Sequence, residues 1–266
     1  MTLFAVTLVP ALRTELPFLV EVLFWLYVPI SFICVAVYAA KEIRAGRLVS
    51  SGNSPAPWVV TRLSAWLFIL CVLLLLFIQN AFYMVLVVLG VAALLAENRR
   101  SAREQFGLGR LPAAKLVRWS LLVCGAVILI EAPLTEAVQA AMTALHVPHP
   151  EQESVVTFRQ FDRPGQIFDF MIQAVLLSPL IEELFFRGFL LTFLKNYTST
   201  WLALVLSAGI FAFAHANLGS AAQLWVLGVV LGVAYEHTGS LLLPMGIHAC
   251  WNLITALSLL LEKGGG

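Results

Sequence analysis

Two adjacent carboxylates and an arginine, Glu182, Glu183 and Arg187, lie in the middle of the apolar run 177–190. Charges in such a run are costly unless they are paired or wetted, so the cluster marks a candidate functional site. Residues four apart share a helical face, and Glu183 is therefore expected to pair with Arg187. Glu182 points about 100° away around the helix. Its neighbour four positions on is Phe186, which offers no partner, so this acid is left for a group elsewhere.

Further polar residues occur in later apolar runs. Phe211 and His215 are four apart, as are His248 and Asn252, so each pair occupies one helical face. A single buried histidine is more often a packing residue than a catalytic one. Together with Glu182, however, these side chains each need a partner in surroundings that supply none, and one shared wet pocket satisfies them all. A purely structural reading, a buried salt bridge with a spare acid facing a crevice, stays open.

Such a pocket has the parts for hydrolysis by water. A desolvated glutamate can act as a general base, while an imidazole N–H and a carboxamide can stabilise an oxyanion, a contribution of about 3–4 kcal/mol in other hydrolases. The sequence contains no HExxH motif of zinc proteases and no GxSxG motif of serine hydrolases. A zinc-dependent version with Glu182, His215 and His248 as ligands stays open, although their spacing carries no specific metal signature.

The composition places these residues in a membrane. Hydrophobic residues make up 61% of the 266 residues and charged residues 12%, whereas soluble domains carry about 25% charge. The net charge of +1 and the lack of a basic stripe give no indication of a nucleic-acid partner. Residues 1–12 lack a basic start and a clear cleavage site, so no cleaved signal peptide is predicted. The cysteines lie far apart in apolar runs, which predicts buried, reduced thiols at Cys34, Cys71, Cys124 and Cys250.

The apolar runs predict an all-α fold, a polytopic membrane bundle of about eight transmembrane helices, because one span needs about 20 apolar residues. We interpret residues 1–266 as a single membrane domain with its catalytic core at 166–261. The run 58–96 is too long for one span and is expected to turn at Gln79-Asn80. The expected spans are 17–40, two within 58–96, 116–134 with an extension to 145, one beginning near 166, 201–216, 221–235 and 241–261.

Loop charges give an orientation. The loops after the first and third predicted spans are rich in lysine and arginine and belong on the cytoplasmic side, which leaves the N-terminus outside. Glu131 and Glu136 lie near the outer end of the fourth span, and we expect both to snorkel to the interface. If every span were a straight rod, His215 would lie near the outer face and His248 nearer the inner one. That difference in depth conflicts with a shared pocket.

With these three motifs in hand, the chain resembles the type II CAAX prenyl endopeptidase family, the glutamyl intramembrane proteases that are also grouped with bacteriocin-processing and immunity proteins. The family pattern of EExxxR, FxxxH and HxxxN is complete here and in order. The similarity covers roughly 168–256, and the segment 228–240 also looks like the family, although His237 stands where a basic residue is commoner. The first half, about 1–165, is family-like only in being hydrophobic.

The resemblance implies a role for each residue. Glu182 would activate a water that His215 helps to bind, while His248 and Asn252 would stabilise the oxyanion. The second glutamate of the motif, held by the arginine, would shape the site. The implied protein is a metal-independent, multi-pass intramembrane endopeptidase without a cofactor, acting in the lipid bilayer on a membrane-associated protein or peptide substrate. In the eukaryotic branch that substrate is prenylated. Two other classes stay open: a non-catalytic scaffold or immunity protein, and an ion or proton pathway.

Overall fold

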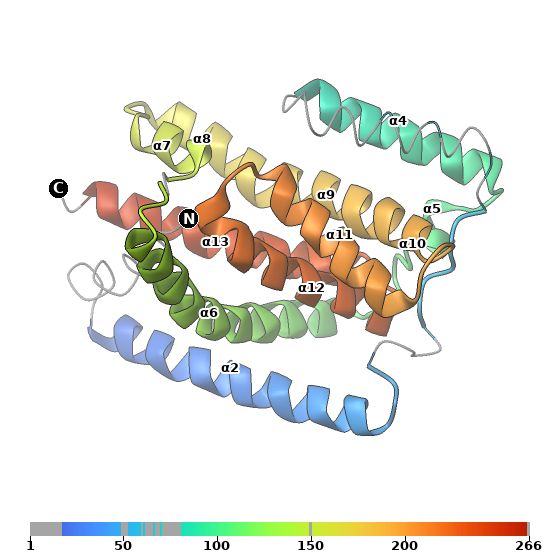
Figure 1. Ribbon diagram of the computed structural model, residues 1–266, viewed down its shortest axis with the longest axis horizontal. Coiled ribbons are helices and arrows are strands. Elements are labelled where there is room, and N and C mark those ends of the chain that lie inside the picture. The colour runs from blue at the N-terminus through green and yellow to red at the C-terminus, as the bar shows by residue number, and fades with distance from the viewer. Residues whose placement is uncertain are drawn as a thin grey trace.

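A computed structural model of the protein (Figure 1) describes residues 18–48, 53–59, 61, 66, 70, 81–148 and 151–264. Within these ranges the chain is helical and forms no strand, which confirms the expected all-α class. The α-helices are α2 (Phe18–Arg44), α4 (Ala81–Glu97), α5 (Ala102–Gln105), α6 (Ala113–Ala144), α7 (Glu153–Arg159), α8 (Pro164–Ile172), α9 (Ser178–Glu183), α10 (Thr192–Leu194), α11 (Thr200–Ala214), α12 (Ala221–Thr238) and α13 (Leu242–Gly264).

Several of these helices are long and apolar enough to cross a membrane. In the described part of the chain they are Leu26–Arg44, Ala113–Ala144, Leu218–Thr238 and Leu242–Lys263. Two shorter apolar helices, Val85–Glu97 and Thr200–Ala214, accompany them. The predicted total of eight stays a prediction, because the expected hairpin turn at 79–80 lies outside the described residues. Cys71 and the N-terminal segment 1–12 also lie outside them. The other cysteines are free thiols, but the expectation that all are buried was wrong for Cys34, which is exposed, whereas Cys124 is buried and Cys250 half-buried.

The helix that carries the two glutamates is a composite. From Pro164 to Leu194 it runs through α8, the π-helical segment η1 (Gln173–Leu177), α9, a second π-helical segment η2 (Leu184–Leu191) and α10. A π turn holds one residue more than an α turn, is rare, and often lies at a functional site. The two π segments flank the short α-helical piece that ends at Glu183, so they set the direction in which the glutamates project.

The helices form a layered bundle (Figure 1). α2 packs along α6, and α6 in turn packs against α12 and α13. The composite helix and α11 cover the other side, since α13 contacts η1 and α11 contacts η2. α4 lies outermost, against η2 and α9. The middle layer of α12 and α13 is therefore enclosed by helices from both halves of the chain.

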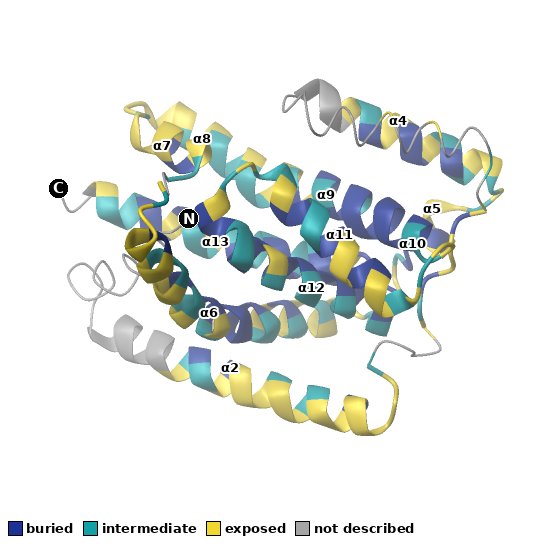
Figure 2. Ribbon diagram, in the orientation of Figure 1, coloured by how far each residue is buried: buried dark blue, intermediate teal, exposed yellow. Residues whose placement is uncertain are grey.

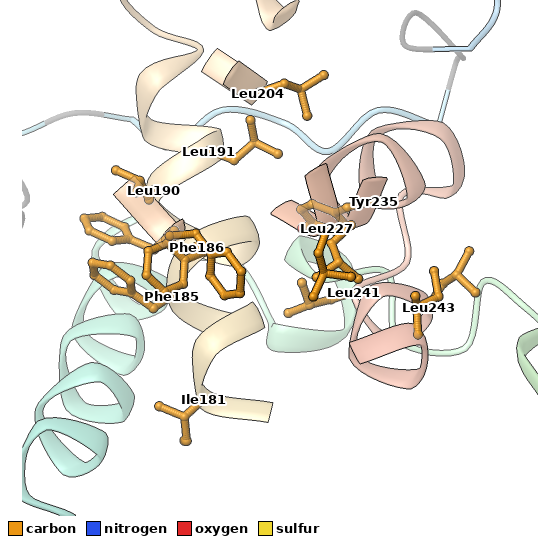
Figure 3. Packing of buried hydrophobic residues seen from close by; sticks show 14 of the residues in the cluster. Ile181, Phe185, Phe186, Leu190, Leu191, Leu204, Leu227, Tyr235, Leu241 and Leu243 are labelled. Atoms are coloured by element: carbon orange, nitrogen blue, oxygen red, sulfur yellow. The ribbon is translucent and has the colours of Figure 1, made fainter. Parts of the chain in front are cut away.

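Burial follows this layering (Figure 2). The composite helix, α11, α12 and α13 carry most buried positions, whereas α2 and α4 expose apolar side chains. Figure 3 shows Phe185 and Phe186 of the composite helix in the core cluster that also includes Leu204 of α11 and Leu227 of α12. The core thus surrounds the segment in which the charged motif occurs.

Small residues let α11 and α12 approach closely. A Cβ atom on Gly228 would lie 2.9 Å from Cβ of Ala208, and one on Gly232 would lie 2.5 Å from Cδ2 of Leu204. Two glycines four apart are a common device for close helix packing in membranes, because backbones can then meet directly. The close contact brings the Gly228 carbonyl within 2.9 Å of Nη2 of Arg187.

Loops of the first half cover the end of the bundle at which α13 begins. The backbone N–H of Leu241 donates to the carbonyl of Phe106, and the indole of Trp58 donates to the carbonyl of Gly188 at 3.0 Å. Gly107 packs so tightly under Gly239 that a Cβ atom there would overlap the Gly239 carbonyl. α13 therefore starts beneath these loops, with Leu241 and Leu243 buried although Leu242 is exposed.

A buried ion pair ties the same end together. Nζ of Lys195 lies 2.9 Å from both carboxylate oxygens of Glu236, which is fully buried, and also 2.9 Å from the Ser54 hydroxyl and the Pro55 carbonyl. These contacts fix the loop 53–59 to the composite helix and α12, because a buried carboxylate and ammonium each need several polar partners.

Candidate active site

Glu182 has one oxygen that is held and one that is free of protein partners. Oε1 accepts a hydrogen bond from the hydroxyl of Ser178, one turn earlier on the helix. Oε2 is buried, has no hydrogen-bond partner, and lies 3.9 Å from Nε2 of both His215 and His248. The structure thus brings together the acid and both histidines that the sequence singled out. The gap of 3.9 Å is longer than a direct hydrogen bond.

Glu183 occupies a different environment one residue later. Its Oε1 accepts hydrogen bonds from Nη1 of Arg187 at 2.7 Å and from Nδ1 of His248 at 2.9 Å. Glu183 and Arg187 are fully or almost fully buried, and the predicted pairing within one helix is present. Arg187 also donates to the carbonyl of Gly228. Glu183 therefore connects the composite helix to α13, and its arginine connects it to α12.

Both imidazole rings donate a hydrogen bond from Nδ1, but to different acceptors. Nδ1 of His215 lies 2.8 Å from the carbonyl of Phe211. A carbonyl only accepts, so Nδ1 carries the hydrogen and Nε2 is left to accept a hydrogen bond. Nδ1 of His248 donates to the carboxylate of Glu183. Its Nε2 accepts when the ring is neutral and donates when the ring carries both protons.

Phe211 forms a wall shared by these groups. Its ring centroid lies 4.8 Å from that of His215 and 5.8 Å from that of His248. Cζ of Arg187 lies over the same ring at 4.7 Å, within the range of a cation–π contact. Phe211 thus packs against the arginine and both histidines and limits how the rings can turn.

Asn252 lies one turn beyond His248 on α13 and faces the composite helix. Its Nδ2 donates to the carbonyl of Ala174, in the π segment η1, at 2.7 Å. No described hydrogen bond joins Asn252 to Glu182 or to either histidine. A carboxamide has two N–H groups, so this contact uses one and leaves the other. The structure therefore ties Asn252 to the backbone next to the acid rather than to the acid itself.

The expected conflict in depth does not occur, because the spans are not equivalent rods. α11 has 15 residues, about 22 Å at 1.5 Å per residue, which is shorter than a hydrocarbon core of about 30 Å. His215 caps its end and therefore stops within the bundle. α13 starts at a covered position under Phe106, so His248 in its second turn is also internal. The straight-rod assumption was wrong, and both histidines reach Glu182.

Glu131 corrects a second expectation. It does not snorkel to an interface: it is 4% exposed, and its Oε2 accepts a hydrogen bond of 2.8 Å from Nε1 of Trp251. Glu136, one turn later, is exposed, and its position at the interface stays a prediction. The contact joins residues 120 positions apart, so no local pattern could have found it. Ser178 was also missed, although the four-residue rule applied toward the N-terminus of Glu182 would have found it.

Comparisons with known proteins agree with the second half of the chain. Residues 164–254 match the family described as type II CAAX prenyl endopeptidase Rce1-like, which confirms the resemblance for that range. An Escherichia coli protein described only as an uncharacterized 24.3 kDa protein is 36% identical over 83 residues, 29% of this chain. The match spans 38% of that relative's length. No solved structure matches.

Proposed function

We propose that this membrane chain is a glutamyl-type intramembrane endopeptidase. The proposal starts from the match of residues 164–254 to the Rce1-like family. One observation carries the proposal: Oε2 of Glu182 is buried without a protein partner, and Nε2 of both His215 and His248 faces it at 3.9 Å. A water between these atoms would accept and donate hydrogen bonds at once, as a nucleophile held for attack requires.

In the proposed reaction, Glu182 is the general base. Water bound between its Oε2 and Nε2 of His215 gives a proton to the carboxylate while its oxygen forms a bond to the peptide carbonyl carbon. The resulting tetrahedral oxyanion accepts hydrogen bonds from Nε2–H of His248 and from the second amide N–H of Asn252. The proton on Glu182 then passes to the leaving nitrogen as the carbon–nitrogen bond breaks. The products are a carboxylic acid and an amine, and Glu182 is ionised again.

Glu183 has a supporting part in this scheme. His248 can donate to an oxyanion through Nε2 only when Nδ1 also carries its proton, since Nδ1 already donates to Glu183. Arg187 pairs with the same buried carboxylate through the hydrogen bond from Nη1, so Glu183 holds the arginine and the histidine together.

The proposed substrate is a membrane-associated protein or peptide, with a lipidated peptide as the first choice. The composite helix exposes Leu176, Leu177 and Leu180 on the turns around Ser178. An apolar surface beside the acid is suited to hydrocarbon chains rather than to water-soluble peptides. A lipidated peptide and its unmodified counterpart should therefore differ, with a lower KM for the lipidated one.

The proposed topology has about eight spans, the N-terminus outside and the basic loops cytoplasmic. Single cysteines at Arg103 and Glu151, placed in a cysteine-free background, would test it. We expect an impermeant thiol reagent to label the cysteine at 151 in intact cells, and that at 103 only after the membrane is opened. The opposite pattern would reverse the orientation.

The test of the chemistry is peptidase activity of the purified protein in detergent. Glu182→Gln keeps the size of the side chain and its contact with Ser178 but removes the base, so we expect kcat to fall about 10²- to 10⁴-fold. Glu136→Gln, an exposed glutamate of α6 away from the site, is the matched control and should cleave like the parent. Cleavage by Glu182→Gln at the parental rate would refute the general-base role.

A zinc-dependent version uses Glu182, His215 and His248 as ligands. Among the described residues no group of three or more His, Cys, Asp and Glu side chains has the spacing of a metal site. The side chains would therefore have to move closer than 3.9 Å to bind zinc. Activity that is lost with a chelator and restored by added zinc would favour this version, whereas chelator-resistant activity supports the metal-independent one.

A further inference from the structure

Glu131 is a buried acid outside the range that matches the family. It lies in α6, whereas the match begins at residue 164. Its Oε2 accepts from Nε1 of Trp251, and its Oε1 is buried without a hydrogen-bond partner in the described structure. An indole N–H is a neutral donor, so the contact is not an ion pair. Burying a leucine at this position would cost less free energy than burying a glutamate. The glutamate differs from it by accepting the hydrogen bond from Trp251.

Trp251 stands between two residues of the candidate site. It follows His248 by three positions and directly precedes Asn252, all on α13. His248 and Asn252 donate hydrogen bonds to the composite helix, on one side of α13. Trp251 donates to α6, which packs against α13 and does not carry the catalytic motif. α13 is thus held from two neighbouring helices at the level of the site.

These contacts fix the rotation of α13 about its own axis. The imidazole of His248 extends several ångströms from that axis, so a small rotation shifts Nε2 away from its position 3.9 Å from Oε2 of Glu182. The hydroxyl of Thr135 donates to the backbone carbonyl of Glu131 at 2.8 Å, which anchors the same turn of α6 near Pro133.

We propose that Glu131 is a positioning residue of the candidate site. Its carboxyl oxygen holds the indole of Trp251, and through Trp251 it sets the rotation of α13 that places His248 and Asn252 beside Glu182. The inference rests on the proposed peptidase function. It gives the first half of the chain, which the family match does not cover, a direct part in the geometry of the site.

Kinetics of four variants test the role. Glu131→Gln keeps an oxygen acceptor of the same reach, and we expect its kcat to stay within about twofold of the parent. Glu131→Leu removes the acceptor, and Trp251→Phe removes the donor while keeping an aromatic ring. Each should lower kcat about tenfold, the effect of one lost hydrogen bond, with little change in KM. Glu136→Gln, exposed on the same helix, is the control.

The outcomes separate positioning from plain structure. Recovery in Glu131→Gln of the activity lost in Glu131→Leu supports the proposal, and a double variant of Glu131→Leu with Trp251→Phe should be no slower than the slower single variant. Parental kcat in Trp251→Phe would overturn it. So would a Glu131→Gln variant as slow as Glu131→Leu. If Glu131→Leu does not fold, the kcat of Trp251→Phe and that of Glu131→Gln are compared instead, because the first lacks the hydrogen bond and the second keeps it.

A second measurement does not depend on activity. With ¹⁵N-labelled tryptophan, Trp251→Phe identifies the indole N–H signal of Trp251. We expect that signal to change little in Glu131→Gln and more than the other indole signals in Glu131→Leu. An unchanged signal in Glu131→Leu would overturn the contact itself. The parent protein could also prove no more active than Glu182→Gln while the indole signals change as expected. That result would show that the proposed function is wrong and that the contact between Glu131 and Trp251 is right.

Discussion

The π segment η2 in the second half and the helix α2 in the first half place their apolar side chains in opposite environments. The half that matches the family encloses its charged motif, so that Glu183 and Arg187 are hidden among phenylalanines. In the first half, α2 exposes Ile33 and Val37 at 60% and 66%. Lipid solvates such side chains as well as a protein core does, so an exposed apolar helix is stable there. At Glu183 and Arg187, burial therefore keeps charged groups away from lipid.

The first half contacts the second by helix packing, since α6 packs against α12 and α13, and also by specific polar contacts. Trp58 and Phe106 cover the end at which α13 begins, and Glu131 holds Trp251 from the side. These residues are nearly fully buried, as are several apolar residues of α4 and α6. The first half therefore supports the site through specific contacts and through the hydrophobic core that α4 and α6 share with the second half.

The sharpest test of this contrast is Arg187→Leu, which leaves the buried carboxylate of Glu183 without its arginine. We expect it to lower the free energy of unfolding by about 3–5 kcal/mol, as for other broken buried pairs. Thermal unfolding in detergent measures the effect. Arg103→Leu, an exposed arginine of the first half, is the control and should change stability by less than about 0.5 kcal/mol. Equal unfolding temperatures of the two variants would contradict the expected difference between a buried and an exposed arginine.

A smaller effect is expected where α11 meets α12. In Gly228→Val the new Cβ would lie 2.9 Å from Cβ of Ala208, so the helices must separate. We expect a loss of about 1–3 kcal/mol from overpacking, with reduced peptidase activity because His215 caps α11. Gly209→Ala, where nothing lies within 4 Å, is the matched glycine control and should leave both unchanged or raise stability slightly. Tolerance of valine at 228 would contradict the close packing.

The contribution of the first half is measured by Trp58→Phe. The variant keeps an aromatic ring but loses the hydrogen bond to the Gly188 carbonyl, and we expect a loss of about 1 kcal/mol. Trp66→Phe, at a tryptophan that is 69% exposed, should have no measurable effect on the unfolding temperature. If both variants unfold at the same temperature as the parent, the loop 53–59 does not stabilise the second half.

The smallest effect concerns the exposed capping box of α5. The backbone N–H and the hydroxyl of Ser101 bind Glu104 and lower the pKa of its carboxyl below the ordinary 4.5. The ionised form is thus favoured by folding, so this stabilisation is present above pH 4.5 and is lost as the pH falls through the lowered pKa. Glu104→Gln should therefore melt below the parent at neutral pH and converge with it in acid. A difference that is independent of pH would contradict this assignment.

Local relations in the sequence predicted the parts of the site that lie within one helix. Glu183 with Arg187 and Phe211 with His215 are four apart, and helical geometry alone brings such residues together. The helices of the second half were predicted to within a few residues, because long apolar runs with clear ends have few alternatives. The same reasoning placed Glu182 on a different face from Glu183.

Relations between helices could not be obtained in this way. Asn252 donates to a backbone carbonyl in a π segment, and no residue type announces a π turn. Glu131 and Trp251 are joined only by packing across the bundle. The shared depth of His215 and His248 depends on a short helix and on a covered helix start. Both features follow from tertiary contacts, whereas a reading of spans assumes that each helix crosses independently.

The loop 53–59 has a consequence for the order in which contacts form during synthesis. Trp58 donates to the Gly188 carbonyl and accepts from Asn196, partners that follow it by 130 and 138 positions. Because a chain emerges from the ribosome N-terminus first, the indole N–H and the carbonyl of Trp58 are made before their partners. The segment meets them only when the composite helix arrives. The loop 53–59 can therefore take its final position only after the chain has been made as far as Asn196.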